Sequence, residues 1–342
     1  MNLSLRIGRW MAAVLLILTL VSGLRAAATG DAFLGRWALT LPGGYPGWLE
    51  VKRENGWYDG SLLWRWGSVN PLASVTITDG VLTVTRLVEV QRKDPAGKLV
   101  RTQQLTDTIT ARVEGDNLKL SHSMPRDDGA GFESADFTGR RIPALPPAPD
   151  LARVQFGPPI ALFNGVNLAG WRLLEPGAEN GWTVEQGALV NRPAEAPEGA
   201  PHRDFGNLRT DREFTDFRLT LEVNVPAKSN SGVYLRGLYE VQVLDSYGQP
   251  LDSHNMGALY SRITPTVAAE KPAGEWQSLD ITLVDRHVTV ILNGRTIIDN
   301  QPVLGCTGGA LTSDESRPGP IFLQGDHGRV SFRNLVIRPV VK

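Results

Sequence analysis

The feature that most constrains this chain is a two-residue alternation of apolar and polar side chains. From residue 217 to residue 225 every odd-numbered residue is apolar and every even-numbered residue is polar. Successive side chains of a β-strand point to opposite faces, so this stretch predicts a strand with one buried face. After residue 28 no stretch keeps an apolar period of 3.6 residues. The sequence therefore predicts an all-β protein.

Turn signals separate the alternating stretches. Asp79-Gly80 and Asn293-Gly294 are dipeptides that favour tight hairpins, and residues 114–117 give a similar signal. The chain also contains 36 glycines and 23 prolines in 342 residues, which favours many short strands joined by turns. Strands spaced by about 8 to 12 residues are typical of a β-sandwich.

The first 28 residues are predicted to be a signal peptide. Arg6 and Arg9 precede the apolar run Trp10–Leu24, and Ala26–Ala28 supply small residues for cleavage. We expect export to the periplasm or the medium, and no integral membrane segment after cleavage. An uncleaved N-terminal anchor is the alternative.

A proline-rich segment divides the remaining chain. Six prolines lie between residues 142 and 159, where they predict a semi-rigid extended linker. Residues 30–141 are then an accessory antiparallel domain, a small sheet or barrel of six to eight strands. Residues 160–342 are a second β domain.

Charge and cysteine content exclude some classes of protein. The formal net charge of −1 provides no clustered cationic surface, so nucleic acid is not expected as a partner. Cys306 is the only cysteine, so the chain forms no internal disulfide. We expect Cys306 to be a small buried apolar residue.

The stretch 229–245 contains the first candidate site residues. Strand alternation places Glu240 and Gln242 on a polar face, and Tyr234 and Arg236 on the polar face of the preceding strand. Asp245 has the wrong parity for that face. A single bulge near Val243-Leu244 would bring it into the same groove.

This spacing is similar to the carboxylate pattern of jelly-roll retaining glycosidases, which use two carboxyl groups. Gln242 stands where such an enzyme would have an acid, which disfavours that reaction. Glu222 maps to a polar strand face as well. The alternative for Glu240 and Asp245 is that both are solvated surface residues.

A glycine-flanked turn at residues 324–328 contains the second candidate. His327 in such a turn is suited to act as a general base or a ligand, although it is equally suited to bind backbone carbonyls. His202 and His254 are weaker candidates, and no metal-binding motif is present. The sequence requires no cofactor; a divalent cation is left open, and its ligands are unknown.

The second half resembles the 3-keto-disaccharide hydrolase domain family from about Leu162 to Pro339. The blocks that carry the resemblance occur in order: Leu162-Phe163-Asn164-Gly165 with Leu168-Ala169-Gly170-Trp171; Asn230-Ser231-Gly232 with Leu235-Arg236-Gly237; Tyr239 to Asp245; Gly257-Ala258-Leu259-Tyr260; Pro272 to Trp276; Leu292-Asn293-Gly294; and Leu323-Gln324 through His327-Gly328 to Phe332-Arg333-Asn334. The sequence departs at Gln277-Ser278 and in the extra Gly325-Asp326 spacing before His327.

The resemblance implies a concanavalin-A-like jelly roll that cleaves glycosides already oxidised at C3. A ketone at C3 acidifies the C2 hydrogen, so a base can remove it, the group at C1 leaves, and water adds back. Glu240, Asp245 or His327 is the expected base. Arg236 or a bound cation would stabilise the enolate oxygen. The expected substrate is an oligosaccharide or other glycoside, held by six residues: Glu222, Tyr234, Arg236, Gln242, Tyr260 and Gln324.

Two functions of other classes stay open at this point. A non-catalytic glycan-binding module needs hydrogen-bonding groups and aromatic rings but no group with a shifted pKa. An ordinary retaining glycosidase is the less favoured alternative. The first half resembles no family, and an accessory domain there would shield the groove, bind glycan or orient a partner.

Overall fold

The computed structural model describes residues 31–193 and 205–341. These residues form two compact units, one made mainly of residues 31–142 and the other mainly of residues 143–341. The predicted signal peptide and His202 lie outside the described residues.

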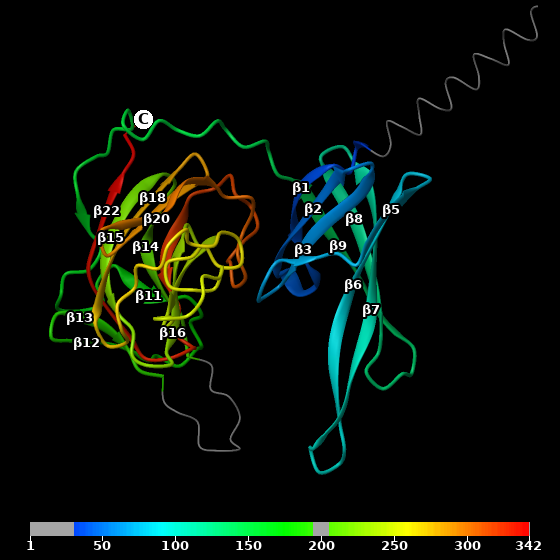
Figure 1. The fold of residues 1–342 in the computed structure, drawn as a ribbon, viewed down its shortest axis with the longest axis horizontal. Coiled ribbons are helices and arrows are strands. Elements are labelled where there is room, and N and C mark those ends of the chain that lie inside the picture. The colour runs from blue at the N-terminus through cyan, green and yellow to red at the C-terminus, as the bar shows by residue number, and fades with distance from the viewer. Residues whose placement is uncertain (1–30, 194–204, 342) are drawn as a thin grey trace, which may run out of the picture. The chain divides into compact units, whose positions relative to one another are not determined.

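The first unit is built on a nine-stranded sheet in the order β4-β3-β2-β1-β9-β8-β7-β6-β5 (Figure 1). A short 3-10 turn, η1 (Pro42–Gly44), follows the first strand. The strands are β1 (Gly35–Thr40), β2 (Pro46–Glu54), β3 (Trp57–Trp64), β4 (Asn70–Pro71), β5 (Ser74–Thr78), β6 (Val81–Lys93), β7 (Leu99–Glu114), β8 (Asn117–Pro125) and β9 (Phe132–Arg141).

The two edges of this sheet are joined by one short stretch of chain. The amide of Leu72 donates to the carbonyl of Gly60 on β3 at 3.0 Å, and the amide of Ala73 donates to the carbonyl of Thr85 on β6 at 2.8 Å. The segment that contains β4 and β5 is therefore bonded to β3 in its first part and to β6 in its second, and so connects the two ends of the sheet order. Side chains such as Trp37, Leu39 and Leu82 are fully buried and form the core of this unit.

The second unit contains an eight-stranded sheet and a five-stranded sheet. The larger has the order β12-β13-β22-β15-β18-β19-β20, with β10 beside β22, and the smaller has the order β11-β14-β21-β16-β17. The strands are β10 (Ile160–Ala161), β11 (Trp171–Leu173), β12 (Trp182–Glu185), β13 (Ala188–Asn191), β14 (Leu208–Phe214), β15 (Phe217–Asn224), β16 (Asn230–Leu235), β17 (Tyr239–Leu244), β18 (Trp276–Val284), β19 (His287–Leu292), β20 (Arg295–Pro302), β21 (Gly319–Leu323) and β22 (Val330–Pro339).

The two sheets form an all-β jelly-roll sandwich, as the sequence predicted (Figure 1). Along β15 burial alternates residue by residue, as the apolar pattern of 217–225 predicted. In contrast, nearly every residue of β16, β17 and β21 is buried. Both faces of the smaller sheet are therefore covered in this region. One face packs in the core, and the other carries the polar groups described below.

The hairpin turns have the backbone conformations that their sequences require. Asp79 and Gly80 both have positive φ, at 52° and 71°, between β5 and β6. Asn293 and Gly294 have φ of 50° and 80° between β19 and β20. Two consecutive positive φ values define the turns that match the twist of a hairpin, so these predictions are confirmed.

Part of the proline-rich segment is bound to the second unit. Arg286 donates hydrogen bonds to the carbonyls of Pro143 and Ala144, at 3.0 and 2.6 Å, and Asn300 donates to the carbonyl of Pro149 at 3.0 Å. Proline cannot donate but keeps its carbonyl acceptor, so side-chain donors suit such a segment. Further along, Phe156 forms a bridge with Val340.

Two other expectations concern single features. Cys306 is 1% exposed, which confirms that it is a buried residue. Among the described residues, no helix has the length and apolar character needed to cross a membrane.

Candidate active site

Three aligned side chains form the floor of the site. Tyr234 on β16 pairs directly with Glu240 on β17, and on its other side with Phe322 on β21. Directly paired residues in a sheet share a face, so the three side chains lie in one row. The Tyr234 and Phe322 rings stack with centroids 3.8 Å apart and planes 12° apart. This stacking holds the Tyr234 hydroxyl beside the carboxyl of Glu240, at 2.8 Å from Oε2.

The next row has a gap at its centre. Gly232 pairs with Gln242, and the amide of Gln324 donates to the carbonyl of Gly232 at 3.0 Å. A Cβ on Gly232 would lie 2.2 Å from Oε1 of Glu240, so the Glu240 side chain would have to move. The glycine therefore leaves room for the Glu240 carboxyl and creates a hollow between Gln242 and Gln324.

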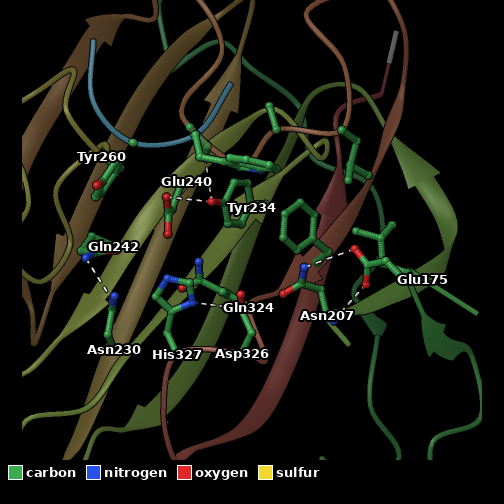
Figure 2. A pocket seen from close by; sticks show the side chains of 18 residues that line it. Glu175, Asn207, Asn230, Tyr234, Glu240, Gln242, Tyr260, Gln324, Asp326 and His327 are labelled. Atoms are coloured by element: carbon green, nitrogen blue, oxygen red, sulfur yellow. Dashed lines mark hydrogen bonds and ion pairs between the residues drawn. The ribbon is translucent and has the colours of Figure 1, made fainter. Parts of the chain in front are cut away.

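A segment outside the named strands closes the β17 edge of this sheet. The amide of Tyr260 donates to the carbonyl of Glu240 at 2.9 Å, and the amide of Gly257 donates to the carbonyl of Gln242 at 2.8 Å. These bonds place the Tyr260 side chain beside Glu240 in the pocket (Figure 2).

The turn after β21 brings a histidine and an acid to the same place. Nδ1 of His327 lies 2.5 Å from Oδ1 of Asp326. Figure 2 shows the His327 ring between Asp326 and the carboxyl of Glu240, with its second ring nitrogen turned toward the side of the pocket formed by Glu240 and Gln242. An acid at one nitrogen leaves the other free to take or give a proton.

These groups line a cavity of about 440 Å³. Its polar lining in residues 174–327 consists of Glu175, Asn207, Asn230, Tyr234, Glu240, Gln242, Tyr260, Gln324, Asp326 and His327. Cavities of this size hold small ligands, and convergent amides and hydroxyls are suited to bind sugar hydroxyl groups.

The carboxyl of Glu240 is electrostatically unusual. It is 4% exposed, and burial raises its pKa to about 8, although the Tyr234 hydrogen bond and the nearby His327 oppose the shift. At neutral pH this carboxyl is therefore mostly protonated. Burial also raises the pKa of Tyr234 well above its ordinary value, so the phenol stays neutral.

The pKa of His327 is raised as well. The hydrogen bond to Asp326 raises its pKa above the ordinary value of 6.5, and Glu240 acts in the same direction. The pocket thus contains a mostly protonated acid and a histidine whose pKa is raised by an acidic partner, which are groups suited to general acid and base chemistry.

The comparisons with known proteins identify the family of the second unit. Residues 158–338 match the 3-keto-alpha-glucoside-1,2-lyase-like domain, which is more than half of the chain. The chain belongs to this family. The resemblance predicted from the sequence blocks is therefore confirmed, and the second unit is a 3-keto-glucoside lyase-like domain. A search of curated proteins found no match.

Several solved structures are similar to this lyase-like domain. A Parabacteroides distasonis protein provisionally named a glycosyl hydrolase is 30% identical, with a TM-score of 0.43; the match covers 58% of this chain and 94% of that one. A second such protein from the same organism is 21% identical, with a TM-score of 0.43, covering 54% and 94%. A carbohydrate-binding module from Bacillus subtilis is 12% identical, with a TM-score of 0.33, covering 48% and 93%.

The lyase-like domain brings together six of the residues expected from the sequence: Glu240, His327, Tyr234, Gln242, Tyr260 and Gln324. Asp245 does not join them. The β16–β17 register is regular, so the predicted bulge near Val243-Leu244 is wrong. Asp245 follows the end of β17, where its Oδ2 accepts from the amide of Lys228 at 2.9 Å.

Arg236 also lies outside the pocket lining. It follows the end of β16 with φ of 57°, which ends the strand alternation on which its expected orientation depended. Its guanidinium is buried and donates to the carbonyl of Glu315 at 2.7 Å and to that of Arg317. It holds a loop rather than facing a ligand.

Glu222 belongs to the other sheet. On β15 it accepts hydrogen bonds from Arg333 at 2.7 Å and Asn334 at 2.6 Å, both on β22. The Arg333 hydrogen bond lowers the pKa of Glu222. Arg333 and Asn334 thus tie the last strand to its neighbour, and Glu222 is their partner.

Four of the polar lining residues named above were not expected from the sequence. Asn230 has the same strand parity as Tyr234, so the alternation could have found it. Asp326 adjoins His327 and was considered only as part of the turn. Asn207 and Glu175 lie outside strands, and only the pairing of β14 with β21 and of β11 with β14 brings them to the pocket.

His254 lies next to this set. Its Nδ1 is 2.5 Å from Oδ1 of Asp252, and its ring meets Tyr260 edge-on at 4.8 Å. Across residues 31–193 and 205–341, no group of three or more histidine, cysteine or acidic side chains is arranged to hold a metal ion.

Proposed function

We propose that this domain cleaves 3-keto-glycosides by eliminating the group at C1 and then adding water. The observation that carries the proposal is the mostly protonated Glu240 carboxyl facing the His327–Asp326 pair across a polar pocket. Membership in the lyase-like family supports the choice of substrate.

In the first step His327 is the base. Its neutral ring takes the C2 proton, which the C3 ketone has made acidic, and Asp326 stabilises the imidazolium that forms. The side-chain amides of Gln242 and Gln324 border the hollow over Gly232. They are suited to bind the sugar and enolate oxygens.

In the second step Glu240 is the acid. The C1–O bond breaks as C1 and C2 become doubly bonded, and the Glu240 proton goes to the departing oxygen. Water then adds its oxygen to C1 and a proton returns to C2, so the net reaction is hydrolysis. Neither oxidant nor reductant is consumed.

Tyr234 accommodates both protonation states of Glu240. Its hydroxyl lies 2.8 Å from Oε2 of Glu240 and 2.8 Å from the carbonyl of Gly308, and its one proton serves one acceptor at a time. While Glu240 is protonated, the phenol donates to Gly308. After Glu240 has lost its proton, the phenol turns to the carboxylate, so the charge is not left without a hydrogen bond.

The test is to incubate the protein with a 3-keto-disaccharide and with its unoxidised parent, and to follow the release of reducing sugar. We expect release from the keto form only. The Glu240→Gln variant should lose about 100-fold or more in kcat. Binding of both sugars without release would refute the proposal and support the glycan-binding alternative.

The pH profile is a second test. The reactive form has neutral His327 and protonated Glu240, so kcat/KM should fall above about pH 8 and below the raised pKa of His327. In the Asp326→Asn variant the pKa of His327 should be lower, because its largest perturbing partner is gone. The acid limb should then move to lower pH. An unmoved acid limb would exclude His327 as the base.

A further inference from the structure

The groove over the smaller sheet is longer than the reacting centre. One row of neighbours begins on β17 and β16 and continues past the ends of β21, β14 and β11: Gln242 and Gly232 pair directly, and Gln324 bonds to Gly232. The side-chain oxygen of Asn207 then accepts from the amide of Gly325 at 2.9 Å, and the amide of Leu174 donates to the carbonyl of Asn207 at 2.8 Å. Four steps of about 4.8 Å give a length of about 19 Å.

Within the described residues, this row is closed at one end and lined by polar groups at the other. At the β17 edge the segment 257–260 is hydrogen-bonded to the strand and closes the groove with Tyr260. The catalytic groups lie over β17, β16 and the turn after β21. From there the pocket continues toward β14 and β11, where Asn207 and Glu175 line it and leave room for the C1 substituent of a bound ring (Figure 2).

The chemistry of that far end is fixed by hydrogen bonds. The carboxylate of Glu175 lies 3.3 Å from the amide nitrogen of Asn207 through Oε2, and 3.5 Å from its Nδ2 through Oε1. Asn207 is anchored in turn by its bond from Gly325. The Glu175 side chain is otherwise exposed, so it presents an oriented acceptor to any ligand at this end.

The charges of the pocket favour some ligands over others. Its lining within the described chain contains no lysine or arginine. Asp326 lies at the reacting centre, where it is paired with His327, and Glu240 is mostly protonated at neutral pH. At the far end of the groove the acid is Glu175, and no cation in this lining lies beside it. A negative group placed beside it would be repelled, whereas hydroxyl and ammonium groups would be bound.

We propose that Glu175 and Asn207 form the subsite for the leaving group, and that this subsite selects neutral or amine-bearing leaving groups over anionic ones. The inference rests on the proposed elimination reaction and adds the class of substrate on which it acts.

The experiment compares three aryl 3-keto-glucosides that differ only in a neutral, carboxylate or aminomethyl substituent on the leaving group. The wild type should cleave the carboxylate substrate with kcat/KM about tenfold or more below the neutral one, mainly through KM. In Glu175→Gln the ratio of kcat/KM for the carboxylate substrate to kcat/KM for the neutral substrate should rise at least about fivefold toward unity. Glu185→Gln removes an exposed acid of β12 that is paired with Arg192 outside the pocket, and should leave the ratio unchanged.

The outcomes separate this inference from the proposed function. Equal cleavage of the neutral and carboxylate substrates by the wild type, or a ratio that Glu175→Gln does not change, would overturn the subsite while leaving the reaction intact. Cleavage of no substrate would refute the reaction. Calorimetric binding of a neutral disaccharide and of its uronic-acid counterpart then tests the subsite alone: Glu175→Gln should weaken the discrimination between them, and unchanged discrimination would overturn it.

Discussion

At the scale of single residues, Glu240 makes the folded state sensitive to pH. Its pKa is about 8 when folded and near 4.5 when unfolded. The folded state holds this proton more tightly than the unfolded state. The contribution of Glu240 to the free energy of unfolding is therefore greatest below about pH 4.5. It falls as pH rises to about 8, by at most about 1.4 kcal/mol per pH unit. Glu240→Gln carries no such charge. It should gain about 2–4 kcal/mol relative to the wild type between about pH 5 and pH 8.5 in urea denaturation.

Glu222→Gln is the control, because the contribution of Glu222 to stability changes with pH in the opposite direction. The Arg333 hydrogen bond lowers the pKa of Glu222, so its contribution is present above the ordinary pKa of 4.5 and is lost as pH falls through the folded value. This variant should be less stable than the wild type at neutral pH and should approach it in acid. A Glu240→Gln variant that tracked the wild type at every pH would mean that the carboxyl is not held neutral by burial.

Gly232 is predicted to be essential because of its missing side chain. Its backbone has no positive φ, so alanine is tolerated there except for the clash with the Glu240 carboxyl. Gly232→Ala should lower kcat about 100-fold and destabilise the protein by about 1–3 kcal/mol through overpacking. Gly177→Ala, where a Cβ meets nothing within 4 Å, is the matched control and should change neither.

A double variant separates this clash from other effects of the alanine. Combining Gly232→Ala with Glu240→Ala removes the group that the new methyl would meet. The double variant should therefore be more stable than the sum of the two single changes predicts, by at least about 0.5 kcal/mol. Simple additivity in denaturation would show that Gly232 matters for a reason other than space for Glu240.

At the scale of elements, the loop between β20 and β21 is held in place by buried arginine side chains. It supplies Gly308 to the pocket, and its later part is bound by Arg236 and by Arg286, whose guanidinium meets the Glu315 carboxylate at 2.9 Å. Arg236→Lys keeps the charge but replaces a planar fork with a single ammonium. We expect a loss of about 1–3 kcal/mol and faster amide exchange in residues 305–317.

The matched control for this prediction lies in the same loop. Arg317 has a side chain that is 78% exposed and is paired with Asp314, so Arg317→Lys should alter neither stability nor exchange. The base limb of the pH profile, which reports on Glu240, should stay where it is in both variants. A shift of that limb in Arg236→Lys would place Arg236 in the chemistry.

At the scale of the whole molecule, the single cysteine reports on the integrity of the second unit. Burial raises the pKa of Cys306 to about 12, and the thiol is 1% exposed. Because the thiolate is the reactive form, a native thiol of this kind should react with a disulfide reagent at least about 1000-fold more slowly than a free cysteine at pH 8. Labelling should become fast only when the sandwich unfolds in urea. Rapid labelling of the native protein would contradict the buried position of Cys306.

The alternation of apolar residues determined the fold class because the apolar side chains of each strand show which of its faces is buried. It also identified the hairpins, since Asp79-Gly80 and Asn293-Gly294 allow the positive φ values that such turns require. The same parity placed Tyr234, Glu240 and Gln242 on one face correctly. It failed at Arg236, because alternation ends where the strand ends, and the sequence does not mark that residue reliably. At Asp245 the parity was right, and the bulge that was expected to overcome it is absent.

Only the tertiary structure decided which polar faces meet. Glu222 alternates as regularly as Glu240, yet it lies on the other sheet, where it is bonded to Arg333 and Asn334. Glu175 and Asn207 reach the pocket through the pairing of strands far apart in the chain, which no local pattern encodes. The raised pKa of Glu240 is likewise a property of burial, which depends on the packing of the whole domain around one carboxyl rather than on its neighbours in sequence.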